Sequence, residues 1–139
     1  MAPAPVKQVT AVWEGRSMVF RGEAAGRAPI VIDGETAEGP SPMDTLLIAM
    51  AGCTGSDVVS VLKKKRLDLR GLRLELRGER REEYPQRYVK IDLLYHVTAP
   101  GATEEAVRQA IDLSLQKYCS VTHSLAPDIP VRYELRLQA

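Results

Sequence analysis

The sequence predicts an α+β fold with the element order βββ-α-ββ-α-β. Two observations support this prediction. Short runs with period-two alternation, typical of half-buried strands, occur near both ends and in the middle of the chain. Two longer stretches between them carry helix-start signals. At 139 residues and 45% hydrophobic, the chain has the size of one globular domain, residues 1–139. We therefore expect antiparallel sheets packed against two helices.

Three short strand-like runs open the chain, at roughly 8–14, 17–23 and 29–33. Turns that contain glycine, at 14–16 and 25–27, separate these runs. Strands joined by such short turns predict a meander of hairpins.

The first helix is expected over about 42–65. Ser41 suits the N-cap, Pro42 suits the first helical position, and Asp44 can close a capping box with Ser41. The middle of this helix, 46–52, is apolar all round, which is typical of a helix enclosed by other elements. Cys53, at the end of this stretch, is therefore expected to be buried.

Alternating residues predict two strands, at 72–77 and 89–97, and a last strand at 131–137. Between them, Thr103 can cap a helix that ends near Cys119, followed by a short helical turn. One face of this helix collects Val107, Ala110, Ile111, Ser114 and Tyr118.

Composition excludes several classes of function. The formal net charge of +1 does not favour nucleic acid or an anionic membrane. The segment Met1 to Pro5 lacks the pattern of a signal peptide, so we expect a cytoplasmic protein. In the cytoplasm, a disulfide is more often catalytic than structural. Two histidines and two scattered cysteines do not predict a zinc site, and no cofactor is expected.

Two segments carry a family resemblance: Ser-Pro-x-x-x-Leu-Leu-x-Ala-x-x-Gly-Cys, which ends at Cys53, and Lys-Tyr-Cys-Ser-Val, which surrounds Cys119. Together they resemble the OsmC/Ohr family of osmotically induced and organic hydroperoxide resistance proteins, closest to its OsmC-like branch. The resemblance implies an intertwined homodimer with the two long helices at its centre and active sites at the subunit interface. It also implies thiol-dependent reduction of organic hydroperoxides, with a lipoylated protein as the external dithiol reductant.

The two cysteines have different expected roles. A mid-helix thiol gains little from the helix dipole, so Cys53 needs a nearby cation to attack a peroxide as a thiolate. Cys119 closes a helix, where a thiolate is disfavoured, so it suits the resolving role. With the resemblance, this predicts a Cys53 sulfenic acid and then a Cys53–Cys119 disulfide. The alternative is that both cysteines serve as small hydrophobic residues.

The cation that Cys53 needs is not determined by the motifs. In the family that the chain resembles, an arginine from the N-terminal region supplies it, so the candidates are Arg16, Arg21 and Arg27.

A glutamate ten residues before the first cysteine holds that arginine in the family, but Met43 occupies the position here. The nearest carboxylate is Asp44, followed by the loop residues Glu35 and Glu38. One residue along a helix is a rotation of about 100°, so Asp44 does not simply replace the glutamate. The other interpretation of Asp44 is that it only caps the first helix.

Further residues are open to two interpretations. The apolar side chains of Phe20, Met43, Leu46, Leu47 and Met50 either line a pocket that favours alkyl hydroperoxides or belong to the core. Asp57, one turn after Cys53, would oppose thiolate formation if it were charged and near the sulfur. For Asp57 we expect a structural hydrogen bond or a regulatory role.

Two functional hypotheses follow. The first is a thiol-dependent organic hydroperoxide reductase of oxidative-stress defence. The second is a binding or redox-sensing protein on the same fold, with an apolar ligand and non-catalytic thiols. Met43, in place of the family glutamate, is the feature that favours the second hypothesis.

Overall fold

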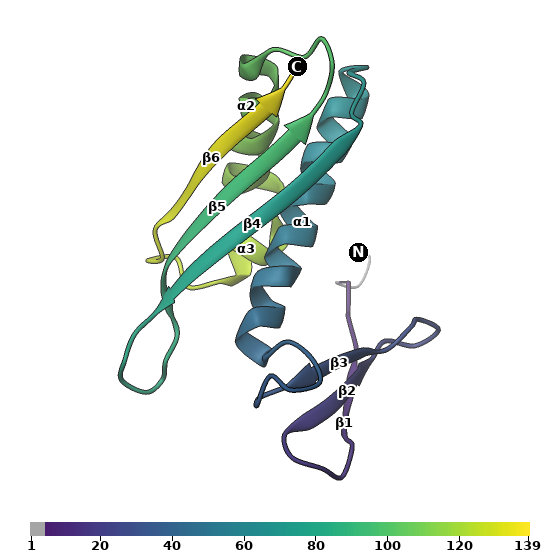
Figure 1. Cartoon of the computed structure of the whole chain (residues 1–139), viewed down its shortest axis with the longest axis vertical. Helices are drawn as coiled ribbons and strands as arrows, with labels where there is room; N and C mark the ends of the chain where they lie inside the picture. The colour runs from purple at the N-terminus through teal and green to yellow at the C-terminus, as the bar shows by residue number, and fades with distance from the viewer. Residues whose placement is uncertain (1–4) are drawn as a thin grey trace. The chain divides into compact units, whose positions relative to one another are not determined.

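The computed structural model describes residues 5–139 (Figure 1). Residues 1–4, part of the segment in which no signal peptide is expected, lie outside the described residues. The chain divides into two compact units, Met1–Leu46 and Leu47–Ala139, which are described separately. That the whole chain forms a single domain stays a prediction.

The first unit contains the predicted meander. Its strands are β1 (Thr10–Trp13), β2 (Val19–Glu23) and β3 (Ile30–Asp33), in the sheet order β1-β2-β3 with antiparallel pairing. Gly15 and Gly26 lie in the two turns with φ of 79° and 74°, a left-handed conformation that glycine adopts without steric cost. The three strands and both turns were therefore correctly predicted.

A buried carboxylate organises the loop that follows β3. Asp33 is fully buried and accepts backbone hydrogen bonds from Glu35, Ala37 and Glu38 at 2.8, 3.1 and 3.0 Å. These N–H groups, that of Glu38 first, hold the pKa of Asp33 below its usual value. The loop is thus fixed by a side chain that must be ionised to serve all three donors.

Helix α1 (Pro42–Lys64) begins with the predicted capping box. Asp44 N donates to Ser41 Oγ, and Ser41 N donates to Asp44 Oδ2, both at 3.0 Å. Within the described part of the chain, α1 alone is long and apolar enough to cross a membrane, a criterion that the core helix of a soluble protein also meets.

The second unit is built on a sheet of β4 (Gly71–Arg80), β5 (Tyr88–Thr98) and β6 (Val131–Gln138), in the order β4-β5-β6. Strands β4 and β5 form the predicted hairpin, but β6 lies parallel to β5. The prediction of purely antiparallel sheets is therefore wrong for this pair. The helical segment between β5 and β6 makes a crossover connection, which returns the chain in the same direction. The α+β class and the element order are confirmed.

That crossover contains three helical pieces: α2 (Glu104–Leu113), the π-helical turn η1 (Ser114–Tyr118) and α3 (Ser120–Ser124). Thr103 caps α2, as predicted, and accepts a hydrogen bond from Ala106 N at 3.1 Å. In η1, Cys119 N donates to Ser114 O at 2.7 Å, an i→i+5 bond in place of the α-helical i→i+4 bond. This wider turn leaves Tyr118 half-exposed and buries Cys119, so the prediction that Tyr118 shares one face with Val107, Ala110, Ile111 and Ser114, which are buried, is wrong.

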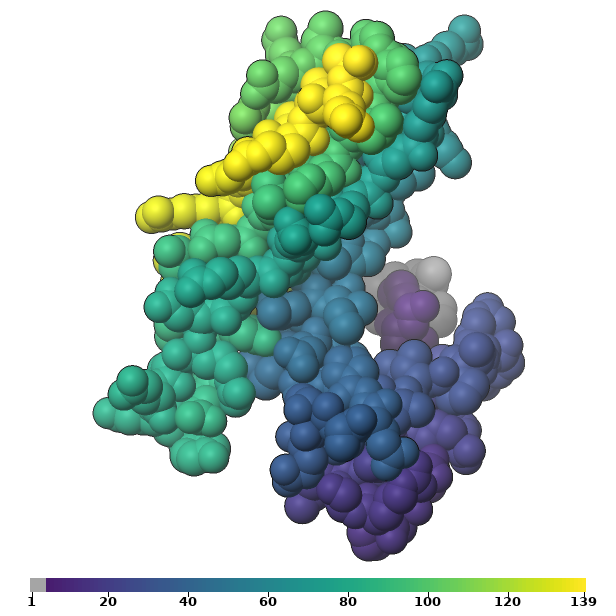
Figure 2. Space-filling view, viewed as in Figure 1, coloured from purple at the N-terminus to yellow at the C-terminus, as the bar shows by residue number. Residues whose placement is uncertain are grey.

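The core of the second unit lies between this sheet and its helices, which lie on one side of the sheet (Figure 1). Alternate residues of β5 are buried: Ile91, Leu93, Tyr95 and Val97. On α1, a Cβ atom at Gly55 would lie 3.4 Å from Leu74 Cδ1, so glycine lets this helix approach β4 closely. The other face of the sheet is at the surface in Figure 2. Its charged residues include Arg73, Glu75, Arg77, Lys90 and Asp92.

Candidate active site

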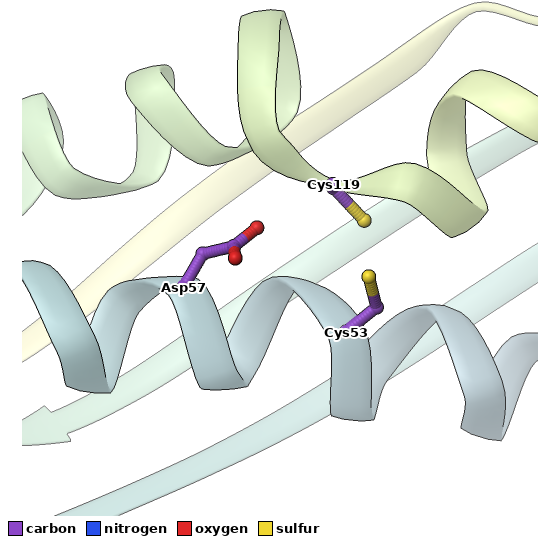
Figure 3. A group of neighbouring side chains, drawn as sticks. All are labelled: Cys53, Asp57 and Cys119. Carbon is purple, nitrogen blue, oxygen red and sulfur yellow. The ribbon is translucent and has the colours of Figure 1, made fainter. Parts of the chain in front are cut away.

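The two cysteines meet in the second unit (Figure 3). Cys53 comes from α1, and Cys119 lies at the junction of η1 and α3. Their Sγ atoms and a carboxylate oxygen of Asp57 all lie within 4.8 Å of one another. Both thiols are free. The two cysteines are 66 positions apart in the sequence, yet a small movement would bring their sulfurs to the distance of a disulfide bond.

The two thiols differ in exposure. Cys119 is fully buried, whereas Cys53 is only partly buried. The prediction that Cys53 is buried is therefore wrong for the single chain. The apolar segment before it is also partly uncovered, since Ile48 on the same helix is exposed.

Cys119 has a more specific environment than a helix C-terminus alone provides. Its sulfur caps the start of α3 and accepts hydrogen bonds from Thr122 Oγ1 at 2.9 Å and Thr122 N at 3.5 Å. Burial raises the pKa of the Cys119 thiol, the two Thr122 bonds oppose this increase, and neighbouring Cys53 adds to it. The thiol form is therefore favoured mainly because the sulfur is buried.

Asp57 is tied to the core by a chain of hydroxyl groups. Ser114 Oγ donates to Asp57 Oδ2 at 2.8 Å. Thr54 Oγ1 lies 2.7 Å from Ser114 Oγ and 2.7 Å from the hydroxyl of Tyr95. Thr54, Tyr95 and Ser114 are buried, and these contacts connect α1, β5 and η1. The structural hydrogen bond expected of Asp57 is present.

The hydrogen bond that Asp57 accepts determines which group donates in each of the other bonds of the series. Ser114 donates its only hydroxyl proton to Asp57, so it accepts from Thr54. Thr54 has a single proton, so it accepts from Tyr95 in turn. Burial raises the pKa of Tyr95, so its phenol is neutral and can donate. The result is a one-way series of donors from Tyr95 to Asp57.

The candidate arginines all make contacts within the first unit. Arg16 forms a two-pronged ion pair with Glu38, at 2.8 and 2.6 Å. The hydrogen bond from Arg16 lowers the pKa of Glu38. Arg21 Nε lies 2.8 Å from Glu23 and 3.6 Å from Glu14. Arg27 donates to the carbonyl of Gly26 at 3.3 Å.

The proposed carboxylate and pocket residues separate by burial. Asp44 is engaged in the capping box, and Met50 is fully buried, the position of a core side chain. Phe20 is exposed. Met43, Leu46 and Leu47 are partly buried. Their roles in substrate binding stay predictions.

A hollow of about 510 Å³ opens beside Asp57. The residues that line it include Asp57, Val61, Lys64, Leu113 and Tyr118. It lies between α1 and the α2–η1 segment and so exposes the carboxylate side of the site to solvent.

The sequence did not point to Thr54, Tyr95, Ser114 or Thr122 as members of the site. For Ser114 a signal was present, because its small hydroxyl side chain stood on the same predicted helix face as the apolar residues Val107, Ala110 and Ile111. A hydroxyl at a buried position needs a hydrogen-bond partner, and that partner proved to be Asp57.

Comparisons with known proteins agree with this fold. The family model described as OsmC-like protein matches residues 34–134. Protein YhfA of Escherichia coli K12 is 38% identical over 123 residues, which cover 88% of this chain and 92% of YhfA.

Solved structures give the same result. A hypothetical protein from Aquifex aeolicus VF5 is 30% identical with a TM-score of 0.84, over 98% of this chain and 100% of that chain. An OsmC-like protein from Mycoplasma pneumoniae has a TM-score of 0.84 at 19% identity, over 97% and 99% of the two chains. The organic hydroperoxide resistance protein OhrB of Bacillus subtilis has a TM-score of 0.62 at 16% identity, over 94% and 98%.

Proposed function

Because the chain belongs to the OsmC-like protein family, we propose that it reduces organic hydroperoxides with Cys53 and Cys119 and serves in peroxide resistance. Two solved structures described as organic hydroperoxide resistance proteins share the fold of this chain. The fold is that of a soluble protein, in keeping with the cytoplasmic location expected from the sequence.

One observation supports this proposal most directly: the sulfurs of Cys53 and Cys119 lie within 4.8 Å, with unequal exposure. The attacking thiol of a peroxidase must be reachable by its substrate, as the partly buried Cys53 is. The resolving thiol must lie close to the attacking thiol and be protected from the oxidant, as the buried Cys119 is. The exposure of the two thiols therefore matches the two roles.

The reaction proceeds in two steps. The Cys53 thiolate attacks the distal oxygen of the hydroperoxide, the O–O bond breaks, and the alkoxide takes a proton and leaves as the alcohol. The Cys119 sulfur then attacks the sulfur of the Cys53 sulfenic acid, and water leaves as the disulfide forms. An external dithiol returns both cysteines to thiols by exchange; the family resemblance suggests a lipoylated protein.

The Arg16–Glu38 pair is the best candidate for the cation that activates Cys53. The planar guanidinium of Arg16 is held by both carboxylate oxygens of Glu38 and so has a fixed orientation. A fixed orientation is needed if the positive charge is to be placed beside a thiolate. Glu38 would then hold the arginine, which in the family is the role of a glutamate at the position that Met43 occupies here. Arg21 is held differently, by Glu23 and more distantly by Glu14.

The test of the proposal is chemical. The reduced protein, with a chelator present, is treated with stoichiometric cumene hydroperoxide, and its peptides are weighed by mass spectrometry. We expect a Cys53–Cys119 disulfide in the wild type and a sulfenic acid on Cys53, trapped with dimedone, in Cys119→Ser. Cys53→Ser should leave Cys119 unmodified. Unmodified thiols in the wild type would refute the peroxidase proposal and favour a non-catalytic binding or sensing protein.

We also propose that the functional form is a homodimer. Trp13 and Ile30, on one face of the β1-β2-β3 sheet, are 57% and 53% exposed, and Phe20 lies beside Trp13 on that face. Such an apolar face requires cover, and the family resemblance names a second copy as the occupant. Sedimentation velocity should show a dimer at micromolar concentration. Trp13→Lys should weaken it, and Tyr84→Lys, in the exposed β4–β5 turn, should not. A stable wild-type monomer would contradict the proposal.

A further inference from the structure

We propose that the reduced site binds one Zn²⁺ ion through Cys53 Sγ, Cys119 Sγ and a carboxylate oxygen of Asp57. These three residues are the group of potential metal ligands that the described part of the chain brings together. Counting cysteines and histidines in the sequence did not predict this site, because its third ligand is a carboxylate.

The geometry suits a tetrahedral ion. Zinc–sulfur bonds of about 2.3 Å and zinc–oxygen bonds of about 2.0–2.2 Å separate tetrahedral ligand atoms by roughly 3.5–3.8 Å. The three ligand atoms already lie within 4.8 Å of one another, so rotation of side chains suffices to close the site. Cys53 and Asp57 are four positions apart on α1 and therefore lie on one helix face (Figure 3). Cys119 faces Cys53 and Asp57 from the junction of η1 and α3.

The groups around the ligands support the same conclusion. Metal-binding side chains are normally oriented by hydrogen bonds from a surrounding layer of residues. Here Ser114 donates to Asp57 Oδ2, which leaves Oδ1 for an ion, and Thr122 Oγ1 donates to Cys119 Sγ. The buried hydroxyls behind Ser114 fix its orientation. A water molecule would be the fourth ligand, and the hollow lined by Asp57 brings solvent to the carboxylate side of the site.

Metal binding and thiol oxidation exclude each other at this site. Binding of Zn²⁺ displaces the protons of both thiols. Oxidation of the loaded site by a hydroperoxide consumes two protons and yields the disulfide, the alcohol, water and free Zn²⁺. The thiolates supply both electrons. A disulfide has no thiolate to offer, so the ion leaves. The site therefore holds zinc only in its reduced state.

The experiment uses the full chain, reduced and freed of metal. Co²⁺ serves as the spectroscopic probe, and Zn²⁺ is then titrated in competition with a chromophoric chelator. We expect one ion per chain and a thiolate-to-cobalt absorption band in the near ultraviolet. Cys53→Ser and Cys119→Ser should each abolish that stoichiometric site. Asp57→Asn should lower the affinity by roughly 10- to 100-fold. Asp68→Asn, with the same charge change at an exposed position, should have no effect.

Circular dichroism checks that the variants fold. If one of them does not, a second measurement on the wild type decides: Zn²⁺ should slow the alkylation of both cysteines by iodoacetamide. Absence of one-to-one binding, or equal affinity in Asp57→Asn and Asp68→Asn, would overturn the proposal. The titration contains no peroxide and the peroxidase test contains a chelator, so each proposal can fail without the other.

Discussion

Ser114 Oγ donates a 2.8 Å hydrogen bond to Asp57 Oδ2, across 57 positions of the sequence. The bond joins the π-helical turn that precedes Cys119 to the helix that carries Cys53. It is also the last step in the series of hydroxyl donors that begins at Tyr95. The relative position of the two thiols is thus connected to the packing of the core.

Replacement of Thr54 by valine should destabilise the second unit. Valine has nearly the same shape but leaves the buried Tyr95 hydroxyl without its acceptor and Ser114 without its donor. We expect a loss of about 1–3 kcal/mol in the free energy of unfolding, measured by urea denaturation. Thr54→Ser, which keeps the hydroxyl, should lose less. Equal losses in the two variants would show that the methyl group, and not the hydrogen-bond chain, stabilises this region.

Replacement of Glu38 by glutamine should lower peroxidase activity with little change in stability. The ion pair with Arg16 is solvent-exposed and screened by water, so its loss should change the free energy of unfolding little. A guanidinium that is no longer fixed should reduce kcat/KM for cumene hydroperoxide by about 10- to 100-fold. Glu23→Gln is the control, because it weakens the shorter of the two ion pairs of Arg21 and leaves the contact with Glu14. Loss of activity in Glu23→Gln alone would assign the cation to Arg21.

Replacement of Thr122 by valine should make Cys119 less reactive. The Thr122 hydroxyl is one of two donors that keep the pKa of the Cys119 thiol from rising further. Its loss should slow alkylation by iodoacetamide at pH 8 about fivefold, the equivalent of a hydrogen bond of about 1 kcal/mol. The measurement uses a Cys53→Ser background with a chelator, so that only Cys119 reacts. Thr122→Ser should react at nearly the original rate; a rate as low as that of Thr122→Val would argue against the hydroxyl.

Stability of the first unit should depend on pH through Asp33. The pKa of Asp33 is lowered in the folded chain, so the ionised form stabilises the fold above the usual carboxyl pKa of about 4. This contribution is lost as the pH falls through the lowered folded value. Thermal unfolding at pH 7, 5 and 3 should show a deficit of Asp33→Asn that is largest at pH 7 and shrinks in acid. A deficit of Asp33→Asn that is the same at all three pH values would contradict this prediction.

Features set by neighbouring residues were predictable from the sequence. The capping box of Ser41 and Asp44 and the cap at Thr103 depend on side chains three positions from the backbone groups they serve. The three strands of the meander and the β4–β5 hairpin follow from alternation and turn residues. The motifs around Cys53 and Cys119 predicted the family, which the comparisons confirm.

Features set by contacts between distant segments were not predictable in this way. The parallel pairing of β5 with β6 depends on the path of the crossover, not on the composition of either strand. Asp57 accepts from Ser114 on η1, and the series behind Ser114 continues through Thr54 on α1 to Tyr95 on β5. The partial exposure of Cys53 reflects what covers α1, which an apolar pattern along that helix does not reveal.

The π-helical turn has a consequence for how this site can tolerate change. Because Cys119 N bonds to Ser114 O five residues earlier, the turn holds one residue more than an α-helix would. Deletion of a single residue between these two would restore the ordinary helical repeat and change the direction in which the Cys119 side chain leaves the turn. We therefore expect the number of residues at 115–118 to be more constrained than their identity. The site is therefore encoded partly as a residue count, which protein engineering by insertion or deletion must preserve.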